Sequence, residues 1–252
     1  MAQAGLARKP IGRFHDIDVN VVYHDAVGTP ADTLVIALPE KRSVLSTRQG
    51  LMETDVICNC HIPRPLWDYM HDESRGWQDT YGRIMKDVLS ELDRTIEQVA
   101  FLSTGVNQEK VAWVENVYDE FWVLAIATAG VHTNAMRVGV DKASGIERNG
   151  KFEKIGTINN IILTNAIFDS STLASSFITV TEAKNVALQD LDIRSAFRPD
   201  LLATGTGTDQ IVVVSGLEHK YIYVGGHTKL GEMMAQAVTQ STIKAIRNSR
   251  GF

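Results

Sequence analysis

The sequence predicts a single mixed α/β (α+β) domain, in which a layered, mixed β-sheet is packed by three long helices. Short β-branched runs dominate the first 60 residues, and three longer segments have helical periodicity. The two kinds of segment are mixed without strict alternation, which favours a layered mixed sheet over a regular barrel. The 252 residues contain no internal repeat and no linker, so we treat 1–252 as one domain.

The predicted strands are short apolar runs between turn residues. They cover 17–23, 33–39, 42–46, 55–62, 99–103, 121–129 and 157–166. The long polar segment 142–154 is predicted to be a loop.

The predicted helices place apolar residues three and four positions apart. The first runs from Asp79, its N-cap, to Ile96, the second covers 170–192 and the third covers 228–248. Lys184 falls in the middle of the apolar stripe of the second helix, which is unusual for a lysine. Two interpretations follow: the ammonium group extends outward along its stem, or it is directed at a site or a buried carboxylate.

The composition is that of an ordinary water-soluble protein. Hydrophobic residues make up 44% and charged residues 22%, and the net charge of −5 gives no basic surface for nucleic acid. The N-terminal segment lacks the apolar core of a secretion signal, and the longest apolar run, 121–131, is about half of the ~20 residues that cross a bilayer. We therefore expect a cytoplasmic protein without nucleic-acid or membrane partners, whose assembly into a homo-oligomer stays open.

Two cysteines lie in the stretch Cys-Asn-Cys-His, 58–61. This spacing does not match a haem-attachment motif, and a structural zinc site needs further ligands that the chain lacks, so no metal site is predicted. Alternation along a strand places Cys58 and Cys60 on one face and His61 on the other. We favour two buried small side chains; the alternative is a thiolate nucleophile paired with a distant histidine.

The loop Ala-Thr-Gly-Thr-Gly-Thr-Asp, 203–209, exposes backbone and hydroxyl groups around one carboxylate. Its glycines permit a positive φ or a close approach to a ligand. It matches neither the dinucleotide-binding fingerprint nor a phosphate-binding P-loop. It is either a ligand site or a tight turn whose threonines bond their own backbone.

Two further loops carry polar side chains. In 225–232, His227 lies where the free N–H groups and the dipole of the last helix favour an anion, and Thr228 is its expected cap. The alternative is a plain glycine turn with a threonine cap. In 128–135, Thr128, His132 and Asn134 form a candidate ligand set or a solvated loop.

Five segments together resemble one known family. Their ranges are 128–135, 156–166, 181–191, 203–209 and 225–232, and they occur in the order and spacing of the adenosylcobinamide amidohydrolase (CbiZ) family. The resemblance spans 121–245, about half of the chain. The N-terminal third is similar only loosely, around 42–51, and the stretches Ile-Cys-Asn-Cys-His-Ile and Met-Arg-Val-Gly-Val-Asp depart from the family pattern where a substrate pocket could differ.

The resemblance implies a hydrolase of corrinoid salvage and cobalamin biosynthesis. Its substrate is adenosylcobinamide, and cleavage of the amide to the aminopropanol arm gives adenosylcobyric acid and 1-amino-2-propanol. The cobalt belongs to the substrate, and no cofactor or metal of the protein's own is expected. The alternative from a different class is a corrinoid or other tetrapyrrole binding protein without hydrolysis.

Such hydrolysis needs a nucleophile, donors for an oxyanion and an acid for the leaving amine. The sequence contains neither the Gly-x-Ser-x-Gly motif nor the His-Glu-x-x-His motif. Under the resemblance, Asp209 and His227 transfer protons, while the backbone of 204–208 and Thr228 donates to the oxyanion. The expected substrate-binding residues are Thr128, His132, Asn134, Asn159, Lys184, Thr204, Gly205, Thr206, Gly207, Thr208 and Thr228.

Overall fold

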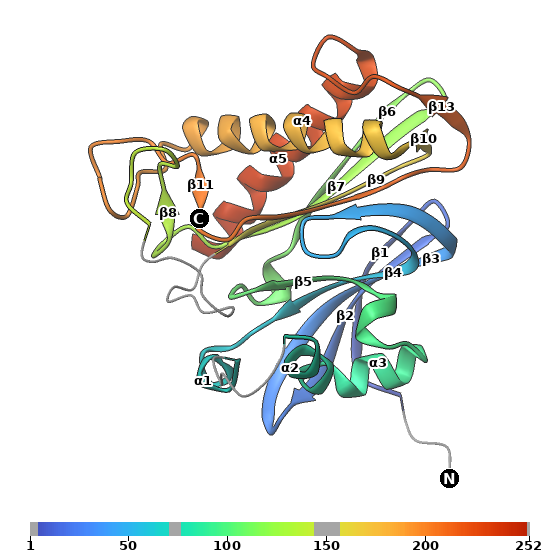
Figure 1. Cartoon of the computed structure of the whole chain (residues 1–252), viewed down its shortest axis with the longest axis vertical. Helices are drawn as coiled ribbons and strands as arrows, with labels where there is room; N and C mark the ends of the chain where they lie inside the picture. The colour runs from blue at the N-terminus through green and yellow to red at the C-terminus, as the bar shows by residue number, and fades with distance from the viewer. Residues whose placement is uncertain (1–4, 71–76, 144–156, 251–252) are drawn as a thin grey trace.

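A curled, mixed β-sheet forms the centre of the protein, as Figure 1 shows for the computed structural model, which describes residues 5–70, 77–143 and 157–250. The strand order is β1-β2-β3-β12-β9-β7-β6, and β4 and β5 extend the sheet from β3. The strands are β1 (Arg8–Phe14), β2 (Ile17–Ala26), β3 (Thr29–Ser46), β4 (Gly50–His61), β5 (Ala100–Thr104), β6 (Ala112–Tyr118), β7 (Phe121–Ala129), β9 (Ile158–Thr164) and β12 (Gln210–Val214).

Two small strand pairs and five α-helices complete the described structure. The pairs are β8 (Ala135–Met136) with β11 (Gly205–Thr206), and β10 (Ala166–Phe168) with β13 (His219–Tyr221). The helices are α1 (Trp67–Met70), α2 (Trp77–Ile84), α3 (Lys86–Leu92), α4 (Ser170–Asp190) and α5 (Lys229–Arg250), with 3-10 turns at Arg64–Leu66, Ile96–Gln98 and Gln108–Lys110.

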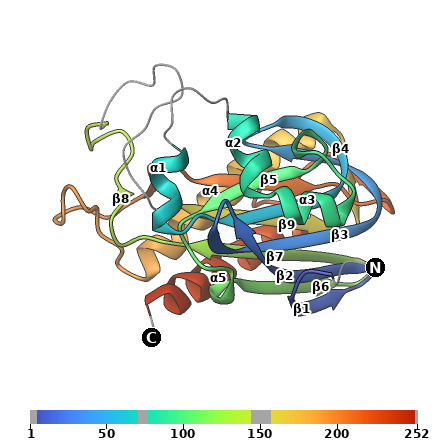
Figure 2. The same ribbon diagram turned by 90° about the horizontal axis from the view of Figure 1, so that it is seen from below.

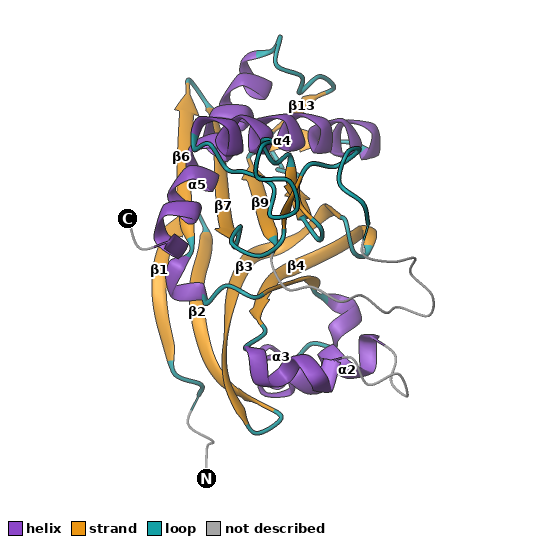
Figure 3. Cartoon of the chain, turned by 90° about the vertical axis from the view of Figure 1, so that its left-hand side faces the viewer, coloured by secondary structure: helices purple, strands orange, loops and turns teal. Residues whose placement is uncertain are grey.

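The curled sheet encloses a core between its two halves. One face of β2–β5 meets one face of β7, β9 and β12, and we call these the inner faces; among the residues between them are Leu34, Ile57, Leu102, Ile126, Ile161 and Val212. Helices α2 and α3 cover the outer face of β2–β5, and α4 and α5 cover the outer face of β7, β9 and β12. Figures 2 and 3 show these helix layers on opposite sides of the sheet. The predicted layered mixed sheet is thereby confirmed.

Side chains bring the two edges of the sheet together. The ring of His15, in the β1–β2 turn, stacks on Trp122 with the ring centroids 4.2 Å apart. The ring of Phe14 meets Trp113 of β6 edge-on, at 6.2 Å between centroids. These aromatic contacts replace the backbone hydrogen bonds that would be needed to close a complete barrel.

The second and third predicted helices agree with α4 and α5, but the first is divided. Helix α2 ends at Ile84 and α3 begins at Lys86, because Met85 between them has a ψ of 11°. Helix α3 ends at Leu92, because Asp93 after it has a left-handed φ of 53°. The predicted apolar positions nevertheless face the sheet and are buried: Tyr81, Ile84, Met85, Val88, Leu89 and Ile96.

The predicted strands 33–39 and 42–46 are parts of one long strand, β3. Its pairing with β4 shifts register between Ala37 and Arg42. Before the shift β3 pairs with β2, and after it with β12, so this strand connects the two halves of the sheet. The predicted loop at 142–154 lies almost wholly outside the described residues. Within the described ranges, no helix is both long and apolar enough to cross a membrane.

Candidate active site

Lys184 of α4 forms a buried ion pair with Asp209, in the loop that precedes β12. Its apolar neighbours on the helix bury the stem, and only 7% of the residue is exposed. Of the two sequence interpretations, the structure agrees with the second: the ammonium group points inward at the carboxylate of Asp209, whose side chain is 15% exposed. A buried lysine needs such a partner because an isolated charge is costly to remove from water.

The Asp209 carboxylate is held by donors on every side. In addition to the Lys184 ammonium group, it accepts hydrogen bonds from the hydroxyl of Thr206 at 2.5 Å, from the Thr206 amide at 3.1 Å and from the Ile158 amide at 3.1 Å. These donors occupy the lone pairs that a carboxylate offers. Asp209 is therefore fixed in place, and its charge fixes the lysine.

Gly205 is required by close approach and not by a positive φ. A Cβ at this position would collide with Asp209 Oδ2 and would lie 2.9 Å from the Nζ atom of Lys184. Two positions further on, a Cβ at Gly207 would lie 3.1 Å from the side chain of Asn134. The first glycine thus leaves the space that the ion pair occupies.

A polar layer caps the core on the inner faces, at the same end of the sheet. Asn59 of β4 donates to the hydroxyl of Thr128 in β7 at 3.0 Å, and its Oδ1 accepts from Asn159 of β9 at 2.8 Å. Asn159 also donates to the backbone oxygen of Ser103 at 2.9 Å. All three linked side chains are buried. Two sequence-predicted residues, Thr128 and Asn159, are thus brought together.

Thr157 joins the polar layer to the ion pair. Its Oγ1 donates to the backbone oxygen of Thr208 at 2.5 Å and lies 3.1 Å from Oδ1 of Asn159. The amide of the next residue, Ile158, donates to Asp209. The two groups are therefore neighbours at one end of β9, with the ion pair toward α4 and the polar layer toward the core.

The threonine amides of the 203–209 loop bond within the loop and to its neighbour β8. Those of Thr204, Thr206 and Thr208 donate to the Met136 backbone oxygen, to Asp209 and to the Thr206 hydroxyl. This is the turn that the second interpretation predicted, with the ion pair added to it. The expected donation from these amides to an oxyanion stays a prediction, and this geometry does not favour it. Asn134 is buried beside the loop, while His132 is exposed in the segment that follows β7.

His227 and Thr228 lie at the opposite end of the sheet. They precede α5, whose Lys229 ammonium group lies 4.8 Å from the ring centroid of Tyr118, at the β6–β7 turn. The Thr228 hydroxyl accepts from the Gly231 amide at 3.1 Å, which is the predicted cap, and His227 is exposed. In Figure 1 this end of α5 and the β8–β11 pair are on opposite sides of the molecule. The structure therefore does not bring His227 to Asp209.

Comparison with known proteins assigns this chain to a family. The model of the adenosylcobinamide amidohydrolase family, CbiZ, matches residues 18–252. The chain belongs to that family. The match includes the N-terminal third, where the sequence resemblance is loose.

Proteins similar to this CbiZ-family chain come from several organisms. The uncharacterized protein MJ1613 of Methanocaldococcus jannaschii is 42% identical over 233 residues, which are 88% of each chain. The PH0078 protein of Pyrococcus horikoshii OT3 has a similar structure, with 16% identity, a TM-score of 0.49 and coverage of 96% of this chain and 88% of that one. The L-aminopeptidase D-Ala-esterase/amidase of Ochrobactrum anthropi gives 9% identity, a TM-score of 0.46 and coverage of 92% and 84%.

The two cysteines of this CbiZ-family chain are buried, as predicted, and they lie beside α2 and α3. Burial raises the pKa of the Cys60 thiol to about 12 and also raises that of Cys58. Both thiols are therefore protonated at neutral pH, and neither is available as a thiolate nucleophile. His61 lies on the inner face, opposite the cysteines, as alternation predicted.

Three groups at this end of the sheet were not among the sequence-predicted site residues: Asn59, Thr157 and the pair Asp32–His61. Each had a signal. Asn59 and His61 are polar residues at alternate positions in the otherwise apolar run 56–62, and Thr157 lies two residues before Asn159 on the same face. A search for polar residues at alternate positions near strand ends would have found them.

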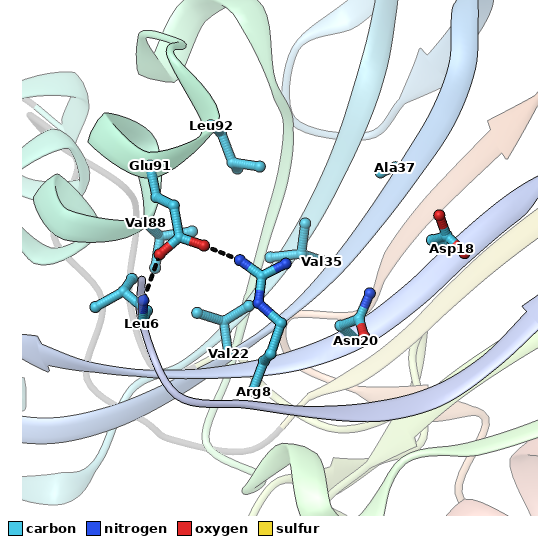
Figure 4. A pocket seen from close by; sticks show the side chains of 10 residues that line it. All are labelled: Leu6, Arg8, Asp18, Asn20, Val22, Val35, Ala37, Val88, Glu91 and Leu92. Carbon is cyan, nitrogen blue, oxygen red and sulfur yellow. Dashed lines mark hydrogen bonds and ion pairs between the residues drawn. The ribbon is translucent and has the colours of Figure 1, made fainter. Parts of the chain in front are cut away.

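A cavity of about 130 Å³ lies elsewhere, between β1–β3 and α3. Figure 4 shows the side chains that line it, among them Arg8, which forms an ion pair with Glu91. It is on the outer face of the sheet and shares no residue with the candidate active site. Its volume is well below the ~300–1,000 Å³ of ordinary small-molecule sites, so it is too small for a corrin ring.

Proposed function

We propose that the protein hydrolyses the amide that joins a propionyl side chain of the corrin ring to the aminopropanol arm of adenosylcobinamide. The products are adenosylcobyric acid and 1-amino-2-propanol, and the step serves corrinoid salvage. The observation that carries the proposal is the family match over nearly the whole chain, together with four of the five family-like segments, 128–135, 156–166, 181–191 and 203–209, which contribute residues to one end of the sheet. The cobalt is part of the substrate.

We assign the Lys184 ammonium group to the oxyanion that forms when water or a hydroxyl adds to the amide carbonyl. A fixed positive charge stabilises such an oxyanion without reorganising during the reaction. Asp209 is then a positioning residue, because its carboxylate accepts from Lys184, Thr206 and Ile158 and has little capacity left to accept a substrate proton. This replaces the proton-transfer role that the sequence suggested for it.

The hydroxyl of Thr157 lies between the ion pair and the polar layer and is a candidate nucleophile beside water. The buried amide groups of Asn59 and Asn159 bond to each other and to the backbone. These hydrogen bonds form a rigid polar layer beneath the site, and such rigidity favours a preorganised reaction centre. Asn134 and His132 border the same end of the sheet and remain proposed contacts for the corrin periphery.

The decisive experiment mixes the purified protein with adenosylcobinamide and measures free 1-amino-2-propanol by mass spectrometry, while the corrin absorbance is recorded. We expect turnover by the wild-type protein and a loss of about 10²–10³-fold in Lys184→Met, the cost of losing one oxyanion donor. A change in corrin absorbance without released aminopropanol would contradict hydrolysis and favour a corrinoid-binding protein.

A further inference from the structure

A second buried carboxylate, Asp32 of β3, holds a histidine at the same end of the sheet. Its Oδ2 atom lies 2.8 Å from Nδ1 of His61, the last residue of β4. Asp32 also accepts from the side chain of Asn107 at 2.9 Å and from the Gln108 amide at 2.5 Å. With these bonds the buried carboxylate fixes the position of the ring, and no step described so far uses this pair.

The pair leaves one ring nitrogen of His61 available. Because the Asp32 carboxylate can only accept, Nδ1 carries a proton, and in the neutral ring Nε2 then presents its lone pair. Within the described ranges, no hydrogen bond to Nε2 is formed. The His61 side chain is 15% exposed and Asp32 only 5%. A buried carboxylate that orients a partly exposed imidazole is the arrangement of a general acid–base pair.

Strand alternation places His61 at the rim of the candidate active site. Asn59 and Asn159 are hydrogen-bonded to each other on the inner faces. His61 lies two residues beyond Asn59 in β4, and Thr157 lies two residues beyond Asn159 at the start of β9, so each is on the same face and about 7 Å further along its strand.

Contacts between neighbouring loops connect these two ends. The segment that binds Asp32 continues from Val106, whose Cγ2 would be 2.9 Å from a Cβ at Gly130. The amide of Gly130 donates to the backbone oxygen of Thr157 at 3.0 Å. In Figure 1, α1, which follows His61, and the β8–β11 pair beside Asp209 are on the same side of the molecule, and Figure 2 agrees for α1 and β8.

We propose that His61, oriented by Asp32, is the acid–base residue of the hydrolysis proposed above, on which this inference rests. His61 Nε2 accepts a proton from the attacking water, or from the Thr157 hydroxyl, as its oxygen bonds to the amide carbon. It then gives that proton to the nitrogen of the leaving aminopropanol as the C–N bond breaks. Where the Thr157 hydroxyl attacks, a water then hydrolyses the resulting ester: His61 takes the proton of that water and returns it to the Thr157 oxygen as the acyl–oxygen bond breaks. By either route one water is consumed overall.

The test measures kcat and KM for aminopropanol release in His61→Gly, His61→Gln and Asp32→Asn. The matched control is His219→Gln, an exposed histidine of β13 at the other end of the sheet. We expect kcat to fall about 10²-fold or more in the three variants, with KM little changed and the control like the wild type. Added imidazole should partly restore His61→Gly, which a purely structural role would not produce.

The outcomes separate this inference from the proposed function. If the wild-type protein turns over substrate and His61→Gln does so within about threefold of the wild-type rate, the role of His61 is overturned and the hydrolysis stands. If the wild-type protein shows no turnover, both proposals are overturned. If the variants do not fold, the wild-type protein is treated with diethyl pyrocarbonate and the modified sites are mapped by mass spectrometry. Loss of turnover should follow modification of His61, and full turnover of protein modified there would contradict the proposal.

Discussion

Lys184 of α4 and Asp209, in the loop before β12, form an ion pair in which each charge offsets the cost of removing the other from water. Removing only the lysine leaves the largely buried Asp209 carboxylate without its counter-charge, which costs up to about 3–5 kcal/mol. We therefore expect Lys184→Met to lower the free energy of unfolding by that amount. The double variant Lys184→Met/Asp209→Asn, which has no charge left, should recover much of the loss.

Chemical denaturation of the wild type, the two single variants and the double variant gives the coupling free energy directly. A double variant whose loss equals the sum of the single losses would show that the two charges do not stabilise each other.

Asp209→Asn separates positioning from packing. Asparagine keeps the size of the side chain but loses the charge that fixes the ammonium group, so we expect turnover to fall about 10²-fold while the fold is kept. Turnover and circular dichroism are measured on the same preparation. A folded variant with wild-type turnover would remove Asp209 from the reaction.

Gly205→Ala tests the space that the ion pair needs. The new methyl group would collide with Asp209 Oδ2, so the carboxylate and the lysine must move, and turnover should fall at least tenfold. Gly82→Ala is the control, because a Cβ there meets nothing within 4 Å and the residue is in α2. Equal turnover in the two variants would show that the pair need not be held in this position.

His227→Ala should have nearly wild-type turnover. The histidine is exposed at the start of α5, at the other end of the sheet from Asp209. The expected change is a small loss of helix stability at most, read from the melting temperature. A loss of turnover of 10²-fold or more would restore the catalytic role that the sequence suggested and would place the active site elsewhere.

The buried His24 predicts a pH dependence of stability. Desolvation lowers its pKa below the usual value of 6.5, against the opposing effects of Asp25, Asp32 and Asp87. As the pH falls below about 6.5, His24 therefore binds a proton in the unfolded state before it does so in the folded state. The free energy of unfolding decreases over this range, until the pH passes the folded-state pKa of His24 as well. His24→Gln should flatten this part of the curve of unfolding free energy against pH, and His219→Gln should not. An unchanged slope in His24→Gln would assign the effect to other groups.

The sequence predicted the parts of the fold that depend on local patterns. The apolar stripes of α4 and α5 and the alternation around Cys58 and Cys60 determine which faces are buried, and the structure confirms them. The stripe of α4 also singled out Lys184 as an unusual residue, but it left open whether the ammonium group points outward or at a carboxylate. The division at Met85 and the fusion of two predicted strands into β3 escaped prediction, because each depends on packing across the sheet.

The site was only partly predictable for a related reason. A motif shows which residues are polar, but the sheet order determines which motifs meet. The 203–209 loop reaches Lys184 because it leads into β12, which lies beside β9. The 225–232 loop comes after β12 has crossed the sheet, so it lies at the other end, near Tyr118. Asp32 and His61 meet because they lie beside each other on β3 and β4, a pairing that no local pattern in the sequence contains.

The most direct test of the central claim is a single-turnover reaction with adenosylcobinamide in isotopically labelled water. The account predicts equal amounts of 1-amino-2-propanol and adenosylcobyric acid, with one labelled oxygen in the new carboxylate of the corrin side chain. Mass spectrometry of both products reads the result. Intact adenosylcobinamide recovered from a folded protein that has bound it would contradict the account.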